Sequence, residues 1–180
     1  MTRRALAVAA VAVLAGCSAD TDTKTYRVPS SSMEPTLHCA RPGIGCEADQ
    51  MDRVAAVAYG HRKPERGDIV VFGTPPAAVR KCGAGGTFIK RLIGLPGERW
   101  SERSGHVYID GTKLDEPYIQ RSRRDTESFR GGLIPAGRYL LLGDNRASSC
   151  DSRVWGLVPR ANLVGRVVEI KRGTKVIHIR

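Results

Sequence analysis

Residues 88–97 read Phe-Ile-Lys-Arg-Leu-Ile-Gly-Leu-Pro-Gly, an apolar run that contains one lysine and ends in a Pro-Gly turn. Side chains alternate between the two faces of an extended chain, so Phe88, Lys90 and Leu92 share one face while Arg91 points to the other. The run therefore predicts a β-strand that holds Lys90 between two large apolar side chains. The alternative is an edge strand from which the Lys90 ammonium reaches water. If Lys90 is buried, desolvation lowers its pKa and makes the neutral amine available as a base.

Similar short runs on both sides of this segment indicate an all-β protein. They are rich in β-branched and aromatic residues and are separated by turn sequences such as Asp110-Gly111. Beyond the N-terminal apolar segment, no stretch of ten residues has helical periodicity. We therefore expect coiled antiparallel sheets in a barrel-like arrangement with little helix. The expected strands are Arg53–Tyr59, Asp68–Phe72, Thr87–Leu95, His106–Ile109, Gly137–Leu142 and Leu163–Lys171.

A serine-rich segment lies upstream, Pro29-Ser-Ser-Ser-Met-Glu-Pro-Thr-Leu37. Pro29 and Pro35 restrict the backbone on both sides of the serines, so the segment can present a hydroxyl at a constant angle. A serine hydroxyl is a weak nucleophile until a base accepts its proton, and a desolvated lysine can act as that base without a histidine or a metal ion. Taken alone, the segment reads as an ordinary Ser-rich turn.

A third segment, residues 141–156, leaves an apolar strand and becomes a loop dense in Asp, Asn, Ser and Arg. Such loops hold neighbouring groups in position through side-chain hydrogen bonds. We expect Asp151 and Arg153 to form an ion pair and Ser149 to orient an amine. The alternative is a network of turns with a structural role only.

The N-terminus has the parts of a secretory signal, with Arg3 and Arg4 before the apolar run Ala5–Ala15. As a helix this run spans about 16 Å, against about 30 Å of bilayer hydrocarbon, so it is too short for a comfortable transmembrane helix. The sequence Leu-Ala-Gly that ends at Cys17 resembles the bacterial lipobox, in which the cysteine is lipidated and becomes the mature N-terminus. An uncleaved marginal anchor and an ordinary secretion signal are the alternatives.

These features divide the chain into a signal sequence (1–16), a tether (17–27) and a catalytic domain (28–180) outside the cell. The net charge of +11 suits an anionic membrane surface as well as nucleic acid. Because the chain has no nucleic-acid-binding module, we expect a membrane surface and not nucleic acid as its partner. We also expect the protein to be a monomer. The nearest basic cluster, Arg121, Arg123 and Arg124, reads as a solvated loop.

Four cysteines follow Cys17, an even number that suits disulfides in an exported chain. They can pair in three ways; we favour Cys39 with Cys46 as a local loop and Cys82 with Cys150 as a long-range bridge. The cysteines form no Cys-x-x-Cys pattern and the histidines are scattered. We therefore expect no metal site and no cofactor.

Together the segments resemble the bacterial type I signal peptidases, membrane-associated serine proteases that use a Ser-Lys dyad. Any one motif is weak, but four in the same order are specific, and they extend from Val28 to Ile170. The four motifs are residues 29–37, 66–72 (Arg-Gly-Asp-Ile-Val-Val-Phe), 89–98 (Ile-Lys-Arg-Leu-Ile-Gly-Leu-Pro-Gly-Glu) and 143–153 (Gly-Asp-Asn-Arg, then Ser, Asp, Ser and Arg), and the fourth is followed by matching residues 155–159 and 162–166.

The resemblance implies a role for each matching polar residue. Ser32 matches the nucleophile and Lys90 the general base. Ser30 matches the residue whose hydroxyl joins the Ser32 backbone N–H in the oxyanion hole. Ser149 matches the serine that hydrogen-bonds the lysine, and Asp151 with Arg153 matches an ion pair that supports the site.

The resemblance also implies the substrate, an exported preprotein with small residues at P1 and P3, cut through an acyl-enzyme at Ser32. The peptide is expected to lie as an added strand between Val28–Ser30 and Phe88–Lys90. Shallow pockets for its small side chains would be lined by Pro29, Met33, Leu37, Val71 and Ile89.

The chain departs from the family mainly at its N-terminus, where a lipobox replaces transmembrane helices. Since 15 residues separate Cys17 from Ser32, at most about 50 Å when extended, a lipid tether would keep the site near the extracytoplasmic face of the cell membrane. Ser31 replaces the usual glycine between the two serines. Two alternatives stay open, a specialised conjugation- or pilin-type processing peptidase of the same fold and a lipid-anchored, non-catalytic signal-peptide binder. The export signal argues against a self-cleaving repressor.

Overall fold

The computed structural model describes residues 23–179. The expected signal sequence (1–16), Cys17 and most of the expected tether lie outside these residues. Within the described part of the chain, no helix is both long enough and apolar enough to cross a bilayer.

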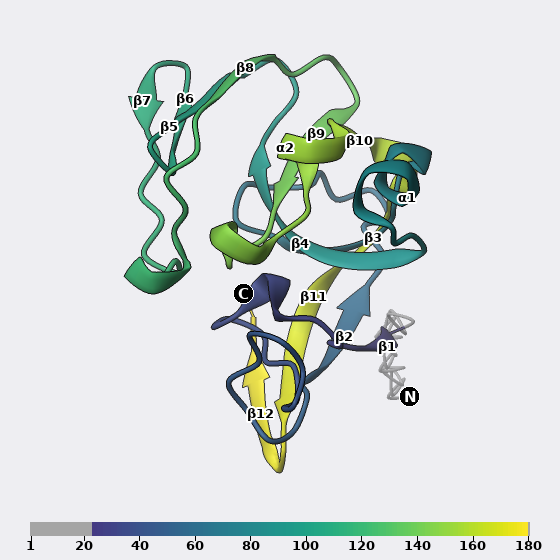
Figure 1. The fold of residues 1–180 in the computed structure, drawn as a ribbon. Helices are drawn as coiled ribbons and strands as arrows, with labels where there is room; N and C mark the ends of the chain where they lie inside the picture. Colours follow the sequence, from purple (N-terminus) through teal and green to yellow (C-terminus); the bar gives the residue numbers. More distant parts are fainter. Residues whose placement is uncertain (1–22, 180) are drawn as a thin grey trace, which may run out of the picture.

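Eight strands form one large antiparallel sheet that curls into a half-barrel (Figure 1). The spatial order is β1-β2-β11-β3-β4-β9-β10, and β12 pairs with β11. The strands are β1 (Thr23–Arg27), β2 (Arg53–Val57), β3 (Ile69–Gly73), β4 (Thr87–Gly94), β9 (Arg138–Leu142), β10 (Val158–Pro159), β11 (Leu163–Arg172) and β12 (Lys175–His178).

A smaller antiparallel sheet is inserted between β4 and β9 and extends away from the large sheet as a second lobe (Figure 1). Its strands, in the order β7-β6-β5-β8, are β5 (Arg99–Arg103), β6 (His106–Ile109), β7 (Thr112–Lys113) and β8 (Phe129–Leu133). Asp110 and Gly111 both have positive φ, 49° and 81°, which is the backbone that a tight two-residue hairpin requires.

The few helical segments are short. The two α-helices are α1 (Pro76–Cys82) and α2 (Ser152–Trp155), and the 3-10 turns are η1 (Ser31–Met33), η2 (Arg121–Arg123), η3 (Arg146–Ser148) and η4 (Arg160–Asn162). The expectation of an antiparallel, mostly β fold with little helix is confirmed. Each of the six expected strands is present, with ends shifted by no more than two residues.

Apolar clusters cover both faces of the sheet centre. Phe72 of β3 and Leu92 of β4 belong to a cluster on one face, whereas Val71 belongs to a second cluster with Met33 and Leu37 on the other. A third cluster joins the large sheet to the second lobe through residues such as Trp100. Because β3 and β4 are buried on both faces, polar side chains on them are held within the protein.

Six of the twelve strands and both α-helices were not among the expected elements, and three of them illustrate why. The strand β1, which pairs with β2 along its whole length, includes residues assigned to the tether. The helix α1 lies between two expected strands, where no helix was expected; it begins at Pro76, a residue suited to the first helical turn, and is capped after Cys82 by Gly83 with φ 67°. The strand β5 reads Arg-Trp-Ser-Glu-Arg, so its charges conceal the alternation that places Trp100 and Glu102 inward.

Candidate active site

Ser32 and Lys90 meet although 58 residues separate them. Ser32 is in η1, which follows Pro29 and is anchored by the buried Met33. Lys90 is on β4, which is paired on both sides, by β3 and β9. Its Nζ donates a hydrogen bond of 2.5 Å to Ser32 Oγ, and Ser30 Oγ lies 3.2 Å from the same oxygen.

Lys90 is 2% exposed, so the alternative of an edge-strand lysine that reaches water is wrong. The Lys90 pKa is lowered from 10.5 to about 8, mainly by burial; the carboxylates of Asp151 and Asp144 oppose this shift, and the positive charge of Arg153 adds to it. A lysine with this pKa has an appreciable neutral fraction near neutral pH. Its amine can therefore accept a proton from the hydroxyl that it contacts.

The polar loop, residues 143–153, is bonded directly to the backbone of the serine segment. The Asn145 backbone N–H donates to Ser32 O at 3.1 Å, and its side-chain amide donates to Ser31 O at 3.0 Å. The sheet pairing between β4 and β9 ends at Arg91 and Leu142. Beyond that point the loop depends on side-chain and turn contacts for its position.

Asp151 and Arg153 form the ion pair expected from the sequence, with Arg153 Nε and Nη2 each 2.9 Å from an Asp151 oxygen. Asp151 also accepts the Gly143 N–H at 3.1 Å and begins α2 by accepting the Arg153 N–H. The pair thus fixes the start and the end of the polar loop relative to each other.

Ser149 is placed differently from expectation. Its Oγ is buried and has no hydrogen-bond partner among the described residues, and the Lys90 Nζ bonds Ser32 Oγ. The serine packs on Gly143, where an added Cβ would lie 2.3 Å from Ser149 Oγ and 2.4 Å from Ser32 O. Only glycine fits between these two residues, so Gly143 sets how closely the loop approaches Ser32.

An open cavity of about 460 Å³ leads to the Ser32–Lys90 pair. The serine segment forms one wall and the start of β4 the other. Of the expected lining residues, the cavity is lined by Val28, Pro29, Met33, Phe88 and Ile89.

The expected lining role of Leu37 and Val71 is wrong. Both are fully buried, with 0% exposure, in the cluster that also contains Met33. Val71 pairs with Ile89 across the two strands, but its side chain packs in that apolar cluster and does not line the cavity. These two residues therefore support the cavity wall from behind.

Two disulfides form, in the pairing favoured from the sequence. Cys82 at the end of α1 is bonded to Cys150 of the polar loop, and both cysteines line the cavity. Cys39 is bonded to Cys46, closing a short loop after the serine segment.

Comparison with known proteins identifies the family of this chain. A family model described as "Signal peptidase, peptidase S26" matches residues 1–171. The chain belongs to this family. The resemblance to bacterial type I signal peptidases is thereby confirmed.

Relatives within the signal peptidase family share roughly a third or more of the aligned residues. Probable signal peptidase I-2 of Synechocystis is 42% identical over 77% of this chain and 58% of its own length. Signal peptidase IB of Staphylococcus aureus is 31% identical over 79% of this chain and 74% of its own length. A solved signal peptidase I from Enterococcus faecalis is 35% identical, with a TM-score of 0.47 over 58% of this chain and 97% of that one. The chain spans less than two thirds of the Synechocystis relative.

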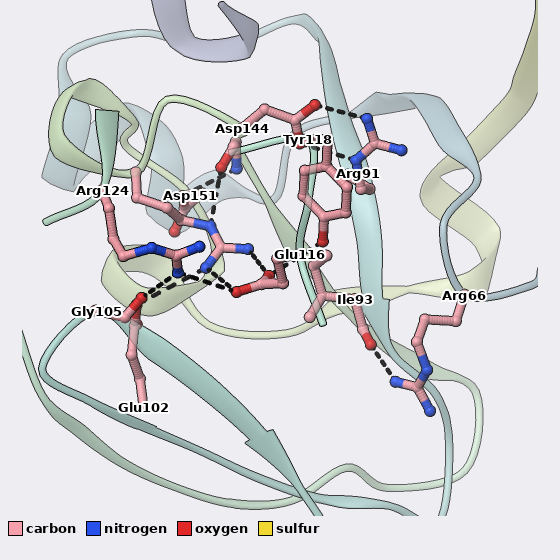
Figure 2. Close-up of polar contacts among 12 residues, drawn as sticks. Arg66, Arg91, Ile93, Glu102, Gly105, Glu116, Tyr118, Arg124, Asp144 and Asp151 are labelled. Carbon is pink, nitrogen blue, oxygen red and sulfur yellow. Dashed lines mark hydrogen bonds and ion pairs between the residues drawn. The ribbon is translucent and has the colours of Figure 1, made fainter. Parts of the chain in front are cut away.

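Several polar residues of this signal peptidase family member were not singled out from the sequence. Asp144 is fully buried and binds the Arg91 guanidinium through two bonds of 2.9 and 2.6 Å, and it accepts the Thr36 hydroxyl at 2.5 Å. Figure 2 shows Arg91 beside both Asp144 and Tyr118. These contacts tie the serine segment, β4 and the polar loop together. Arg91 and Asp144 both lie inside the motifs quoted above, so the sequence marked them as candidates. That the two side chains pair could be seen only in the folded structure.

The structure also brings one histidine into a cluster that the sequence did not predict. Ligand atoms of Glu34, His38 and Glu47 lie within 4.8 Å of one another. The buried Glu34 already accepts hydrogen bonds from His38 Nδ1 at 2.6 Å and from the Cys39 backbone N–H at 3.1 Å. These bonds satisfy its carboxylate and brace the loop that the Cys39–Cys46 disulfide closes.

Proposed function

We propose that this chain is a serine endopeptidase that removes N-terminal signal peptides from exported preproteins. The observation that carries the proposal is the 2.5 Å contact between Ser32 Oγ and the buried Lys90 amine at the base of an open cavity. Family membership supports the same reaction class. A purely binding protein would need neither a buried lysine nor its bond to a serine.

The reaction begins with the neutral form of Lys90. As Ser32 Oγ attacks the scissile carbonyl carbon, its proton passes to Lys90 Nζ, and the carbonyl oxygen becomes an oxyanion. The resulting ammonium then donates a proton to the leaving amine, which releases the mature protein and leaves the signal peptide esterified to Ser32. A water molecule, deprotonated by the neutral Lys90, hydrolyses this ester and restores the enzyme.

Ser30 and the Ser32 backbone N–H are proposed to stabilise the oxyanion. Ser30 Oγ is 3.2 Å from Ser32 Oγ, so a carbonyl attacked by Ser32 lies within reach of the Ser30 hydroxyl. Donors that are already in position where charge develops lower the barrier, and removal of one such donor typically costs about 10²- to 10³-fold in rate.

Supporting roles are proposed for Ser149, Asp151 and Arg153. The Ser149 hydroxyl is buried and unpartnered among the residues described, so it retains hydrogen-bonding capacity for the lysine after the proton transfer. The Asp151–Arg153 pair holds the loop that carries this serine.

The substrate is proposed to lie as an extended strand between the two cavity walls. Residues 28–30 form one wall and residues 88–90 the other, and an extended peptide between them can bond to backbone groups on either side. The apolar side chains of Met33 and Ile89 line the same cavity as Ser32, and we expect them to restrict the room for substrate side chains there. This arrangement favours small residues at P1 and P3.

The protein is proposed to act at the extracytoplasmic face of the cell membrane, anchored by a lipid on Cys17. The strand β1 begins at Thr23, six residues after Cys17, a span of at most about 20 Å. Such a tether would hold the folded domain near the bilayer. The intact mass of the mature protein tests this anchor, because Cys17→Ser should remove the mass of the acyl chains. An N-terminal mass without lipid in the wild type would contradict it.

Cleavage of a preprotein by the detergent-solubilised full chain tests the proposed reaction. Ser32→Ala and Lys90→Ala should each abolish cleavage while the far-UV circular dichroism spectrum is unchanged, whereas Ser122→Ala, on the exposed turn η2, should cleave normally. Mass spectrometry should place the cut after a small residue. Cleavage retained by either dyad variant would show that the assignment is wrong.

A further inference from the structure

Glu116 and Tyr118 lie in the connection between β7 and η2, outside the motifs on which the family resemblance rests. The two residues lie in a turn closed by the Ile119 N–H, which donates to Glu116 O at 3.2 Å, and Pro117 between them has a fixed φ that suits the second position of such a turn. Both side chains turn from the second lobe towards the large sheet. Figure 2 shows Tyr118 between Arg91 and Glu116.

Glu116 holds the polar loop through Arg146. The two side chains are almost completely buried, with 1% and 0% exposure. Arg146 Nη1 donates to Glu116 Oε2 at 3.3 Å, Nη2 donates to Oε1, and Nε donates to Gly143 O at 3.0 Å. A two-point pair of this kind fixes orientation as well as distance. The residue before Arg146 is Asn145, whose backbone N–H bonds the Ser32 carbonyl.

Tyr118 holds β4 through Arg91. The Arg91 guanidinium carbon lies 4.0 Å from the centre of the Tyr118 ring, an attractive arrangement for a cation over an aromatic face. The Tyr118 hydroxyl donates to Glu116 Oε1 at 3.1 Å. The residue before Arg91 on β4 is Lys90. One connected pair of side chains thus reaches to within one residue of both Lys90 and the Asn145 contact with Ser32.

We propose that Glu116 and Tyr118 are positioning residues for the Ser32–Lys90 pair. With Pro117 they form a brace from the second lobe that fixes the polar loop relative to β4. The brace is needed because backbone pairing between β4 and β9 ends at Leu142, before the loop that contacts Ser32 begins. Proton transfer between the two groups requires them to stay within hydrogen-bond distance. This inference rests on the proposed Ser-Lys hydrolysis.

The test measures kcat, KM and the pH dependence of kcat for the full chain, with a fluorogenic peptide that has alanine at P1 and P3. Tyr118→Leu removes the ring beside Arg91, Tyr118→Phe keeps the ring and removes the hydroxyl, and Glu116→Gln removes the charge. Tyr108→Leu is the matched control, because its ring lies 4.3 Å from Arg103 in the same lobe.

Tyr118→Leu and Glu116→Gln should lower kcat at least about tenfold with KM within about twofold, because misplacement of reacting groups affects the chemical step. They should also move the half-maximal pH of kcat upward, since a looser site lets water reach the Lys90 ammonium. Tyr118→Phe should retain kcat within about threefold, and Tyr108→Leu should match the wild type.

A folded Tyr118→Leu protein with wild-type kcat and pH profile would overturn the inference. It would also be overturned if Tyr118→Leu had a lower Tm than the wild type but the same kcat at temperatures well below that Tm. If Glu116→Gln does not fold, the two Tyr118 variants still decide the outcome. Ser32→Ala is assayed in parallel. Cleavage by that variant would instead refute the proposed function, so the two failures are distinguishable.

Discussion

Replacement of Lys90 by methionine should make the protein more stable at neutral pH although it removes the proposed base. The change removes a buried cation and keeps most of the side-chain volume. Burial lowers the Lys90 pKa from 10.5 to about 8, so between these values the unfolded chain binds a proton that the folded chain does not. Stability therefore rises with pH across that window, and below pH 8 the folded protein carries the full cost of the buried ammonium.

The magnitude follows from the two pKa values. Their difference of about 2.5, at about 1.4 kcal/mol for each pH unit, corresponds to roughly 3 kcal/mol at pH 7. Loss of the hydrogen bond to Ser32 offsets about 1 kcal/mol of this gain. Lys90→Met should thus raise the free energy of unfolding by about 2 kcal/mol at pH 7 and by less than about 1 kcal/mol at pH 9.5.

Urea unfolding followed by circular dichroism at these two pH values measures the effect. Lys175→Met, which removes an exposed lysine on β12, is the control and should change stability little at either pH. The reasoning is refuted if Lys90→Met is less stable than the wild type at pH 7, or if its gain is the same at both pH values. Either result would mean that Lys90 is not a desolvated cation in the folded protein.

Three further outcomes are expected. The kcat of the wild type should rise about tenfold from pH 7 to pH 9, because the neutral fraction of Lys90 grows from about a tenth to about nine tenths; a profile that still climbs steeply at pH 10 contradicts this. Joint replacement of Cys82 and Cys150 by alanine opens a loop of sequence separation 68 and should lower the free energy of unfolding by about 4 kcal/mol. Opening the other disulfide, of separation 7, should cost about 2 kcal/mol in the same urea assay, and the reverse order would count against the chain-entropy argument. Gly143→Ala places a Cβ 2.4 Å from the Ser32 carbonyl oxygen and should lower peptide cleavage at least about tenfold, whereas Gly73→Ala, with its nearest neighbour at 4.0 Å, should cleave normally.

Local sequence patterns predicted those elements whose structure depends on interactions between neighbouring residues. The alternation around Lys90 predicted the strand and its face, and Pro29 marked the start of the serine turn. The helix α1 was missed although Pro76 and Gly83 bound it, because seven residues are too few to show helical periodicity. The strand β5 was missed because its buried Glu102 reads as a surface residue until Arg153 and Arg146 are placed beside it.

Contacts between distant segments could not be read from the sequence in the same way. The family resemblance implied that Leu37 and Val71 line the substrate pockets, but both side chains are fully buried in an apolar cluster with Met33. We expected the Ser149 hydroxyl to hydrogen-bond Lys90. Lys90 Nζ instead bonds Ser32 Oγ, and Ser149 Oγ has no partner among the described residues. Both differences arise from packing between segments that are distant in the chain, because a side chain can bond or contact only the groups that packing brings next to it.

The sequence by itself determined the β-rich fold, the family, and a serine and a lysine suited to one reaction, because apolar alternation and motif order are properties of the chain. Only the tertiary structure decided that the lysine is buried and that its amine meets Ser32. Burial and the 2.5 Å contact depend on β4 being covered on both faces and on a loop held by side chains from three other segments. The low dielectric that shifts the Lys90 pKa exists only after those segments have packed.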